Sequence, residues 1–456
     1  MMEASNLQIY WHESQPIYSL CFQPHNGGKR KLLTAGGDNK VRVWMLNFEE
    51  DNDTKIDTID FLSSLTQHEQ AVNVVRFNSN GDVLASAGDD GQLLLWKQND
   101  GLVREFGVED AEFDEFKESW TVWKKIRQGG DAFEIYDLSW SPDNRYIVTA
   151  SMDNAVKIFD VEAGQRILSL TDHNHYVQGV VWDPLNEYIF SQSADRSLNI
   201  YEIVKDSSQA VTGLKMKNKI VKGDLPQRQD TKLLNRDNTK SSMLFHNETL
   251  PSFFRRAAIS PCGSLLCVPA GIFKCDGATE TSNAVYIYTR AALASGNNRP
   301  VMCVPFLKRP AIVVSFNPNR YSISKESYLK LSYKLVFAVA TSNEVLIFDT
   351  ESVEPLGIIG NLHYTPLTDL SWSEDGNLLM VSSTDGFCSY VSLSSDMLGT
   401  RLEEKSSTQM ATIASVEPVH QKTPGIVNIL PVKRAGPAKD CDTPRRINPT
   451  LVIEEE

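Results

Sequence analysis

Histidine, serine and aspartate side chains follow one another in this chain at a spacing that could serve nucleophilic catalysis. His68, Ser86 and Asp90, followed by Trp96, supply the residue types of a hydrolase triad. Parts of the same pattern recur at Thr34, Asp38 and Trp44, and at His173, Ser191, Asp195 and Tyr201. A catalytic site does not recur along a chain, whereas a buried hydrogen-bonded network that fixes a repeated fold does. We therefore predict a structural tetrad (His68, Ser86, Asp90 and Trp96) and no catalytic residue.

Other signatures of catalysis or cofactor binding are missing from the sequence. It contains no G-x-x-x-x-G-K-[ST], no G-x-G-x-x-G after a strand and no H-E-x-x-H. The seven cysteines form no C-x-x-C pair and stand in no zinc-finger register with histidine, which favours buried, reduced thiols in an intracellular protein. We expect no metal, no cofactor and no enzymatic activity.

The elements that position the tetrad are short strands. From residue 68 to residue 96, three alternating apolar segments are joined by turns rich in Asn, Gly and Asp, which predicts an antiparallel meander. One such unit cannot cover both of its apolar faces, so it should recur. Further turns carry an aspartate six residues before a terminal aromatic or apolar residue, at Asp38, Asp153, Asp195 and, in a weaker copy, Asp385.

Seven copies of the preceding strand can be aligned. They lie at 19–24, 74–79, 137–143, 179–185, 257–263, 313–318 and 369–376. These units resemble WD40 repeats, and seven of them predict an all-β, seven-bladed β-propeller. We expect the propeller to span residues 1–393, with insertions at about 98–119 and 205–250. Residues 7–11 should supply the outer strand of the seventh blade and close the ring. Residues 394–456 should form a largely disordered tail.

Charge and composition exclude some classes of protein. A net charge of −13 argues against the whole surface being a DNA-binding face, and no apolar run is long enough to span a membrane. The segment 100–118 has eight acidic residues and could attract a basic partner, or be a solvated loop between blades two and three. The segment 205–240 has nine Lys and Arg and could contact phosphates or an acidic partner, or be a solvated loop as well.

Two further stretches carry candidate functional residues. Phe253, Phe254, Arg255 and Arg256 have the composition of an interface anchor, although packing between blades explains the two Phe equally well. In the tail, two basic pairs resemble a two-part nuclear import signal: Lys433 and Arg434, then Arg445 and Arg446.

The chain as a whole resembles the middle, WD40-repeat subunits of chromatin assembly factor 1, of fungal type. The most specific pieces are LFHNETLPSFFRR (244–256) and the motif RRINPTL (445–451). The resemblance implies a nuclear scaffold subunit of a three-subunit histone chaperone, docked on the large subunit and accompanied by a small WD40 subunit. That chaperone deposits histones H3–H4 on newly replicated DNA, so contact with DNA would be indirect.

The motif in the tail is similar to the one by which this family and the Hir-type co-repressors bind the anti-silencing-function histone chaperone. The resemblance implies roles for Arg445, Arg446, Ile447, Pro449 and Leu451. An extended peptide of this kind can add to a sheet edge, with Ile447 and Leu451 as apolar anchors. Two alternatives stay open: a WD40 subunit of a Hir-type, replication-independent deposition complex, or a WD40 substrate receptor of an unrelated complex.

Overall fold

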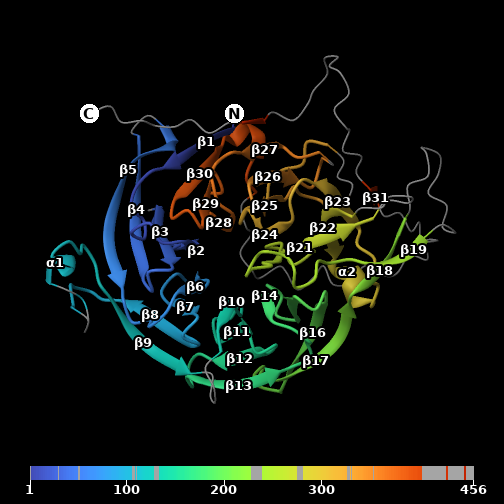
Figure 1. Ribbon diagram of the computed structural model, residues 1–456, viewed down its shortest axis with the longest axis horizontal. Helices are drawn as coiled ribbons and strands as arrows, with labels where there is room; N and C mark the ends of the chain where they lie inside the picture. Colours follow the sequence, from blue (N-terminus) through green and yellow to red (C-terminus); the bar gives the residue numbers. More distant parts are fainter. Residues whose placement is uncertain are drawn as a thin grey trace.

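Seven small sheets stand around a central axis like the blades of a propeller (Figure 1). The computed structural model describes residues 2–402 except 29, 50–51, 105–107, 109, 128–132, 227–238, 275–280, 326–328, 330 and 353, together with 428–429 and 446–447. All seven blades are antiparallel meanders of the expected kind. The predicted all-β, seven-bladed propeller is therefore confirmed.

Each of the first four blades has four strands, numbered outward from the axis. Blade one is β2 (Ile17–Phe22), β3 (Arg30–Gly36), β4 (Val41–Glu49) and β5 (Asn52–Leu65). Blade two is β6 (Val72–Phe77), β7 (Leu84–Gly88), β8 (Gln92–Gln98) and β9 (Trp120–Arg127). Blade three is β10 (Ile135–Trp140), β11 (Tyr146–Ser151), β12 (Val156–Asp160) and β13 (Gln165–Leu170). Blade four is β14 (Val177–Trp182), β15 (Tyr188–Ser193), β16 (Leu198–Lys205) and β17 (Val211–Ile220).

The remaining blades follow the same order. Blade five is β20 (Ala258–Ile259), β21 (Leu265–Phe273), β22 (Ser282–Thr289) and β23 (Met302–Leu307). Blade six is β24 (Ala311–Phe316), β25 (Val336–Thr341), β26 (Glu344–Asp349) and β27 (Gly357–Gly360). Blade seven is β28 (Leu367–Trp372), β29 (Leu378–Ser383), β30 (Cys388–Leu393) and β1 (Met2–Leu7). The short helices are α1 (Asp110–Phe113), α2 (Arg290–Ala294) and α3 (Ser395–Leu398), and a hairpin of β18 (Lys222–Pro226) and β19 (Thr239–Met243) precedes blade five.

The N-terminal segment closes the ring, but with different residues from those expected. β1 pairs with β30 from Met2 opposite Leu393 to Leu7 opposite Cys388, so the closing strand is residues 2–7 and not 7–11. Met2 and Ala4 alternate inward and are buried. The more apolar run that follows serves the core instead: Trp11 is fully buried and packs edge-on against Trp44, with ring centroids 4.9 Å apart.

Both predicted insertions are placed differently by the structure. The acidic segment lies inside blade two, between β8 and β9, and not between two blades. Glu112 and Glu118 in this segment form ion pairs with Lys40 and Lys31 of blade one, at 3.1 and 2.6 Å. In the second segment, residues 211–220 are the outer strand β17 of blade four. The insertion in that region therefore begins only after β17.

A bulge interrupts the inner strand of six blades at the same place. The pairing of the inner strand with its neighbour skips one residue just after the strand begins. The skipped residues are Tyr18, Asn73, Tyr136, Gln178, Ile312 and Thr368. β-Bulges commonly change the direction of side chains next to active sites. Five of these six residues line one cavity at the mouth of the central axis.

Candidate functional site

Complete hydrogen-bonded tetrads pin blades one and two. In blade two, His68 Nδ1 lies 2.8 Å from a carboxylate oxygen of Asp90, and His68 Nε2 lies 2.7 Å from Ser86 Oγ. Trp96 Nε1 donates to the same hydroxyl at 2.8 Å. Asp90 also accepts the backbone N–H of Glu69 and so ties the turn of the blade to the loop that enters it. These groups satisfy one another's hydrogen bonds, which supports a structural role.

Blade one holds the same tetrad, with a histidine that the sequence pattern did not reveal. His12 lies 2.6 Å from Asp38 and 2.8 Å from Thr34, and Trp44 donates to Thr34 at 2.9 Å. His12 precedes its aspartate by 26 residues, whereas His68 precedes Asp90 by 22. Because the spacing in blade one is longer than in blade two, the sequence pattern did not reveal His12.

Other blades keep only part of the tetrad. In blade four His173 contacts Asp195 and Ser191, and Tyr201 replaces the tryptophan. In blade seven His363, which the sequence pattern did not reveal, contacts Asp385, and its Nε2 lies 2.7 Å from Ser389 Oγ on the third strand. Blade three lacks the histidine partner, and Asp153 forms an ion pair with Lys157 instead.

The tetrad aspartates are held as carboxylates. Burial by itself would raise the pKa of Asp90, but the hydrogen bond and charge of His68 outweigh it, so the pKa is lowered. The pKa values of three other aspartates at this position are lowered in the same way by their histidines: Asp38, Asp195 and Asp385. The pKa of His12 is lowered by its complete burial.

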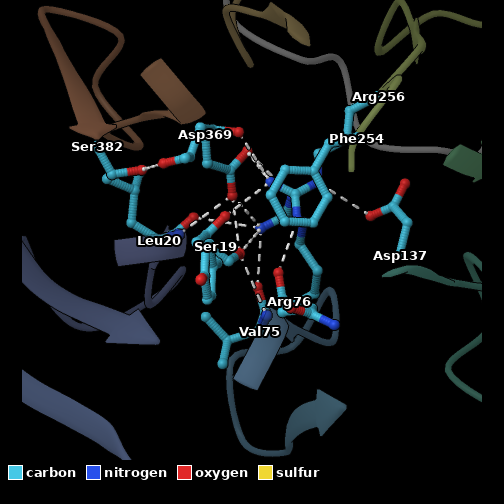
Figure 2. A network of polar contacts seen from close by, with 12 residues as sticks. Ser19, Leu20, Val75, Arg76, Asp137, Phe254, Arg256, Asp369 and Ser382 are labelled. Carbon is cyan, nitrogen blue, oxygen red and sulfur yellow. Dashed lines mark hydrogen bonds and ion pairs between the residues drawn. The ribbon is translucent and has the colours of Figure 1, made fainter. Parts of the chain in front are cut away.

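A second polar network lies on the axis itself and was not predicted (Figure 2). In three blades the turn after the inner strand is closed by the same backbone hydrogen bond, which aligns Asp137, Arg256 and Asp369 at one equivalent position. Because equivalent positions of different blades face one another across the axis, the arginine of blade five meets both aspartates. Its Nε lies 3.4 Å from Asp137, and its Nη1 lies 3.3 Å from Asp369.

Arg256 also binds backbone carbonyl groups of blades one, two and seven. It donates to the carbonyl oxygens of Tyr18 at 3.0 Å, Thr368 at 3.1 Å and Asn73 at 2.7 Å. All three acceptors are bulged residues of inner strands. The Phe254 ring covers the guanidinium, with its centroid 4.0 Å from Cζ. One buried side chain thus joins blades one, two, three, five and seven.

Arg76 and Ser19 complete this network. Arg76 Nη1 donates to Asp369 at 2.9 Å and to Ser19 Oγ at 2.8 Å, and Ser19 donates to Asp369 at 2.8 Å. Burial opposes ionisation of Asp369, but the charges of Arg256 and Arg76 outweigh it and lower its pKa. Burial raises the pKa of Asp137 in spite of the same two arginines.

The segment 244–256 is therefore mostly an internal structural element. Of the four candidate interface residues, Phe254, Arg255 and Arg256 are buried and only Phe253 is exposed, at 62%. Arg255 donates to the carbonyl oxygens of His246 and Asn247, both at 2.5 Å. The segment passes so close to blade four that a Cβ on Gly179 would lie 2.0 Å from the Arg255 carbonyl oxygen. Three of the four residues are thus buried within the chain, and Phe253 is the one that is exposed.

Two short pieces of the tail add to the outer edges of blades. The backbone of β31 (Asn428–Ile429) pairs in parallel with β23, and that of β32 (Arg446–Ile447) pairs in parallel with β27. The other predicted tail residues, Lys433, Arg434, Arg445, Pro449 and Leu451, lie outside the described residues.

The described residues add no sign of metal chemistry or of a membrane segment. Among them, no three His, Cys, Asp or Glu side chains are grouped so that they could hold a metal ion. In the same part of the chain, no helix has the length and apolar character needed to cross a membrane.

The fold and its polar sites define a class of protein: a closed, WD40-type β-propeller whose histidine–aspartate pairs stabilise its own blades. The chain matches the family described as "CAF1B/HIR1 beta-propeller domain" over residues 2–398, and it belongs to that family.

Individual relatives give the same result in more detail. The chain is 53% identical to a chromatin assembly factor 1 subunit of Saccharomyces cerevisiae, over 99% of this chain and 100% of that protein. It is 38% identical to the subunit of the same name from Gallus gallus, over 97% of this chain and 76% of that protein. Protein HIR1 of Yarrowia lipolytica is more distant, at 26% identity over 84% of this chain and 36% of that protein. The resemblance to chromatin assembly factor 1 inferred from the sequence is confirmed.

Proposed function

We propose that this protein is a non-enzymatic, nuclear scaffold subunit of a chromatin assembly factor 1 histone chaperone. In that role it supports replication-coupled deposition of histones H3–H4, together with a large subunit and a small WD40 subunit. The observation that carries the proposal is the 53% identity to the chromatin assembly factor 1 subunit of Saccharomyces cerevisiae, because the alignment spans 99% of this chain and 100% of that relative. A role in a Hir-type complex is less well supported, since the HIR1 relatives align over a smaller part of their length at lower identity.

The stoichiometric partners of the tagged chain, purified gently from its host, test this proposal. We expect a large, highly charged subunit, a second WD40 protein and histones H3 and H4. Partners of a ubiquitin ligase, with no histone chaperone present, would contradict the proposal.

We further propose that residues 445–451 of the tail dock the anti-silencing-function histone chaperone. The motif combines two arginines, which can pair with carboxylates, with Ile447 and Leu451 as apolar anchors. The backbone pairing of Arg446 and Ile447 with β27 supports this proposal, because it is an example of the same stretch adding to the edge of a sheet.

Calorimetric titration of the purified chaperone with the full-length chain tests this docking. Ile447→Ala should weaken the contact by about 2 kcal/mol or more, as expected for a buried anchor. Ile453→Ala is the matched control, because it removes the same side chain from a position just outside the motif. Equal affinity of the Ile447 variant and the unaltered chain would rule out the motif as the docking element.

Replacing Arg445 and Arg446 by Glu should weaken the same contact in a different way. Exposed charge pairs are screened by salt, so the loss should shrink as ionic strength rises, whereas the loss from Ile447→Ala should not. A loss that is independent of salt would argue against ion pairs at these positions.

A further inference from the structure

An apolar cavity of about 620 Å³ opens at one mouth of the central axis. It lies on the face that carries the tetrad histidines and aspartates, because its lining includes turn residues next to them, such as Ala194 and Thr384. Phe254 forms part of the lining, and its ring lies against the buried guanidinium of Arg256 (Figure 2). The axial network therefore adjoins the cavity at Phe254.

Aromatic side chains from three segments form one wall of this cavity. Tyr136 stacks on Phe253, with centroids 6.4 Å apart and an interplanar angle of 29°. Tyr176 meets Tyr136 edge-on at 6.4 Å. Phe253 and Tyr176 are exposed, as is Met152 beside them. Large apolar side chains gathered in the open are typical of interaction surfaces.

The charged groups of the lining are carboxylates, which accept hydrogen bonds. Its charged residues in the described part of the chain are Glu134 and Glu248, and no Lys or Arg is among them. Gln178, at a bulge and 95% buried, uses its amide N–H on the Ser252 carbonyl oxygen, and its amide oxygen has no hydrogen-bond partner among the described residues. Burial is the main cause of the raised pKa of both Tyr18 and Tyr136, and the nearby carboxylate of Asp89 raises these pKa values further.

The carboxylates, the aromatic faces and the unpartnered amide oxygen of Gln178 favour a cation that donates hydrogen bonds. Lysine and arginine side chains donate hydrogen bonds and accept none, and they bind favourably over aromatic faces. We propose that the cavity receives a lysine or arginine side chain of a partner protein, presented on a peptide with apolar neighbours that cover Phe253, Tyr176 and Met152. The proposal concerns the propeller and goes beyond the tail motif and the chaperone assignment, since it names a second, independent docking surface.

A selection of random dodecapeptides displayed on phage, with the full-length chain as bait, tests this proposal. Peptides bound by the chain should carry a basic residue between apolar ones. Measured by fluorescence anisotropy, a selected peptide should lose at least tenfold in affinity when its basic residue is replaced by Gln. The affinity of the unaltered peptide should fall by the same factor when the chain carries Phe253→Ala or Glu134→Gln.

Tyr364→Ala is the matched control, because Tyr364 is a fully exposed aromatic residue on the same face but outside the cavity. It should leave peptide affinity unchanged, and thermal melts should show that all variants are folded. Selected peptides without a basic residue, peptides that bind Phe253→Ala as tightly as the unaltered chain, or no selected peptide at all would overturn the proposal.

Discussion

Arg256 and Asp369 are 113 positions apart in sequence, yet their side chains meet on the propeller axis at 3.3 Å, both almost fully buried. The arginine comes from the segment that leads into blade five, and the aspartate from the inner strand of blade seven. A ring of blades held only by contacts between neighbours can open at any one of its seams. A contact across the axis links blades that do not touch, so opening any seam disturbs it.

Replacing Arg256 by Leu should therefore destabilise the whole propeller. The change leaves Asp369 and Asp137 buried with one fewer cation, and removing one partner of a buried pair costs about 3–5 kcal/mol. Chemical denaturation measures the loss. Arg104→Ala breaks an exposed Arg–Asp pair and should cost less than about 1 kcal/mol. Equal effects of the two substitutions would show that the axial pair adds nothing to stability.

The hydroxyl of Ser86 should stabilise the fold through its hydrogen bonds and not through its burial. Ser86→Ala leaves Trp96 Nε1 and His68 Nε2 without their partner, which should cost about 1–3 kcal/mol. Thr149→Val in blade three is the matched control: Thr149 is fully buried at the equivalent position, and its hydroxyl has no hydrogen-bond partner among the described residues. That substitution should be neutral or stabilising. Equal losses in the two denaturation curves would contradict the role assigned to the tetrad.

Much of this architecture could be predicted because it repeats. The turn aspartates, the inner strands and the count of seven blades are all visible as similarity within one chain. The axial network could not be predicted, because its partners come from blades one, two, three, five and seven and are brought together only by closure of the ring. Asp137 and Asp369 do share a signal in the sequence, since each begins the same Asp-Leu-Ser-Trp run in an inner strand.

The differences between the predicted and the observed elements also have physical explanations. Met2–Leu7 closes the ring although it is less apolar than residues 7–11. The partner strand β30 is itself buried, so backbone pairing and the inward side chains of Met2 and Ala4 are sufficient. Phe254 and Arg256 have the composition of an interface, and they do form one, but between parts of the same chain. Composition alone does not distinguish an inner interface from an outer one.

Acid should unfold the protein partly through its tetrads. The pKa of Asp90 in the folded chain is below the ordinary value of 3.8. Its contribution to stability is therefore fully present above about pH 5 and is lost as the pH falls through the folded pKa. We expect Asp90→Asn to be less stable at neutral pH and to show a flatter dependence of unfolding free energy between about pH 5 and pH 3. The exposed control Asp114→Asn should keep the slope of the unaltered chain; an unchanged slope in Asp90→Asn would refute this account.

Closure of the ring by the N-terminal strand can be tested with substitutions at two adjacent residues. Ala4 is buried opposite Val391, whereas Glu3, one residue earlier, is exposed. Ala4→Asp places an unpaired charge against blade seven and should cost about 3 kcal/mol or more. Glu3→Ala should change stability by less than about 0.5 kcal/mol, since the side chain of Glu3 is exposed. Because β1 closes a single ring, the loss should appear as one lowered transition for the whole propeller. An early, separate transition of blade seven would show instead that the ring does not unfold as one unit.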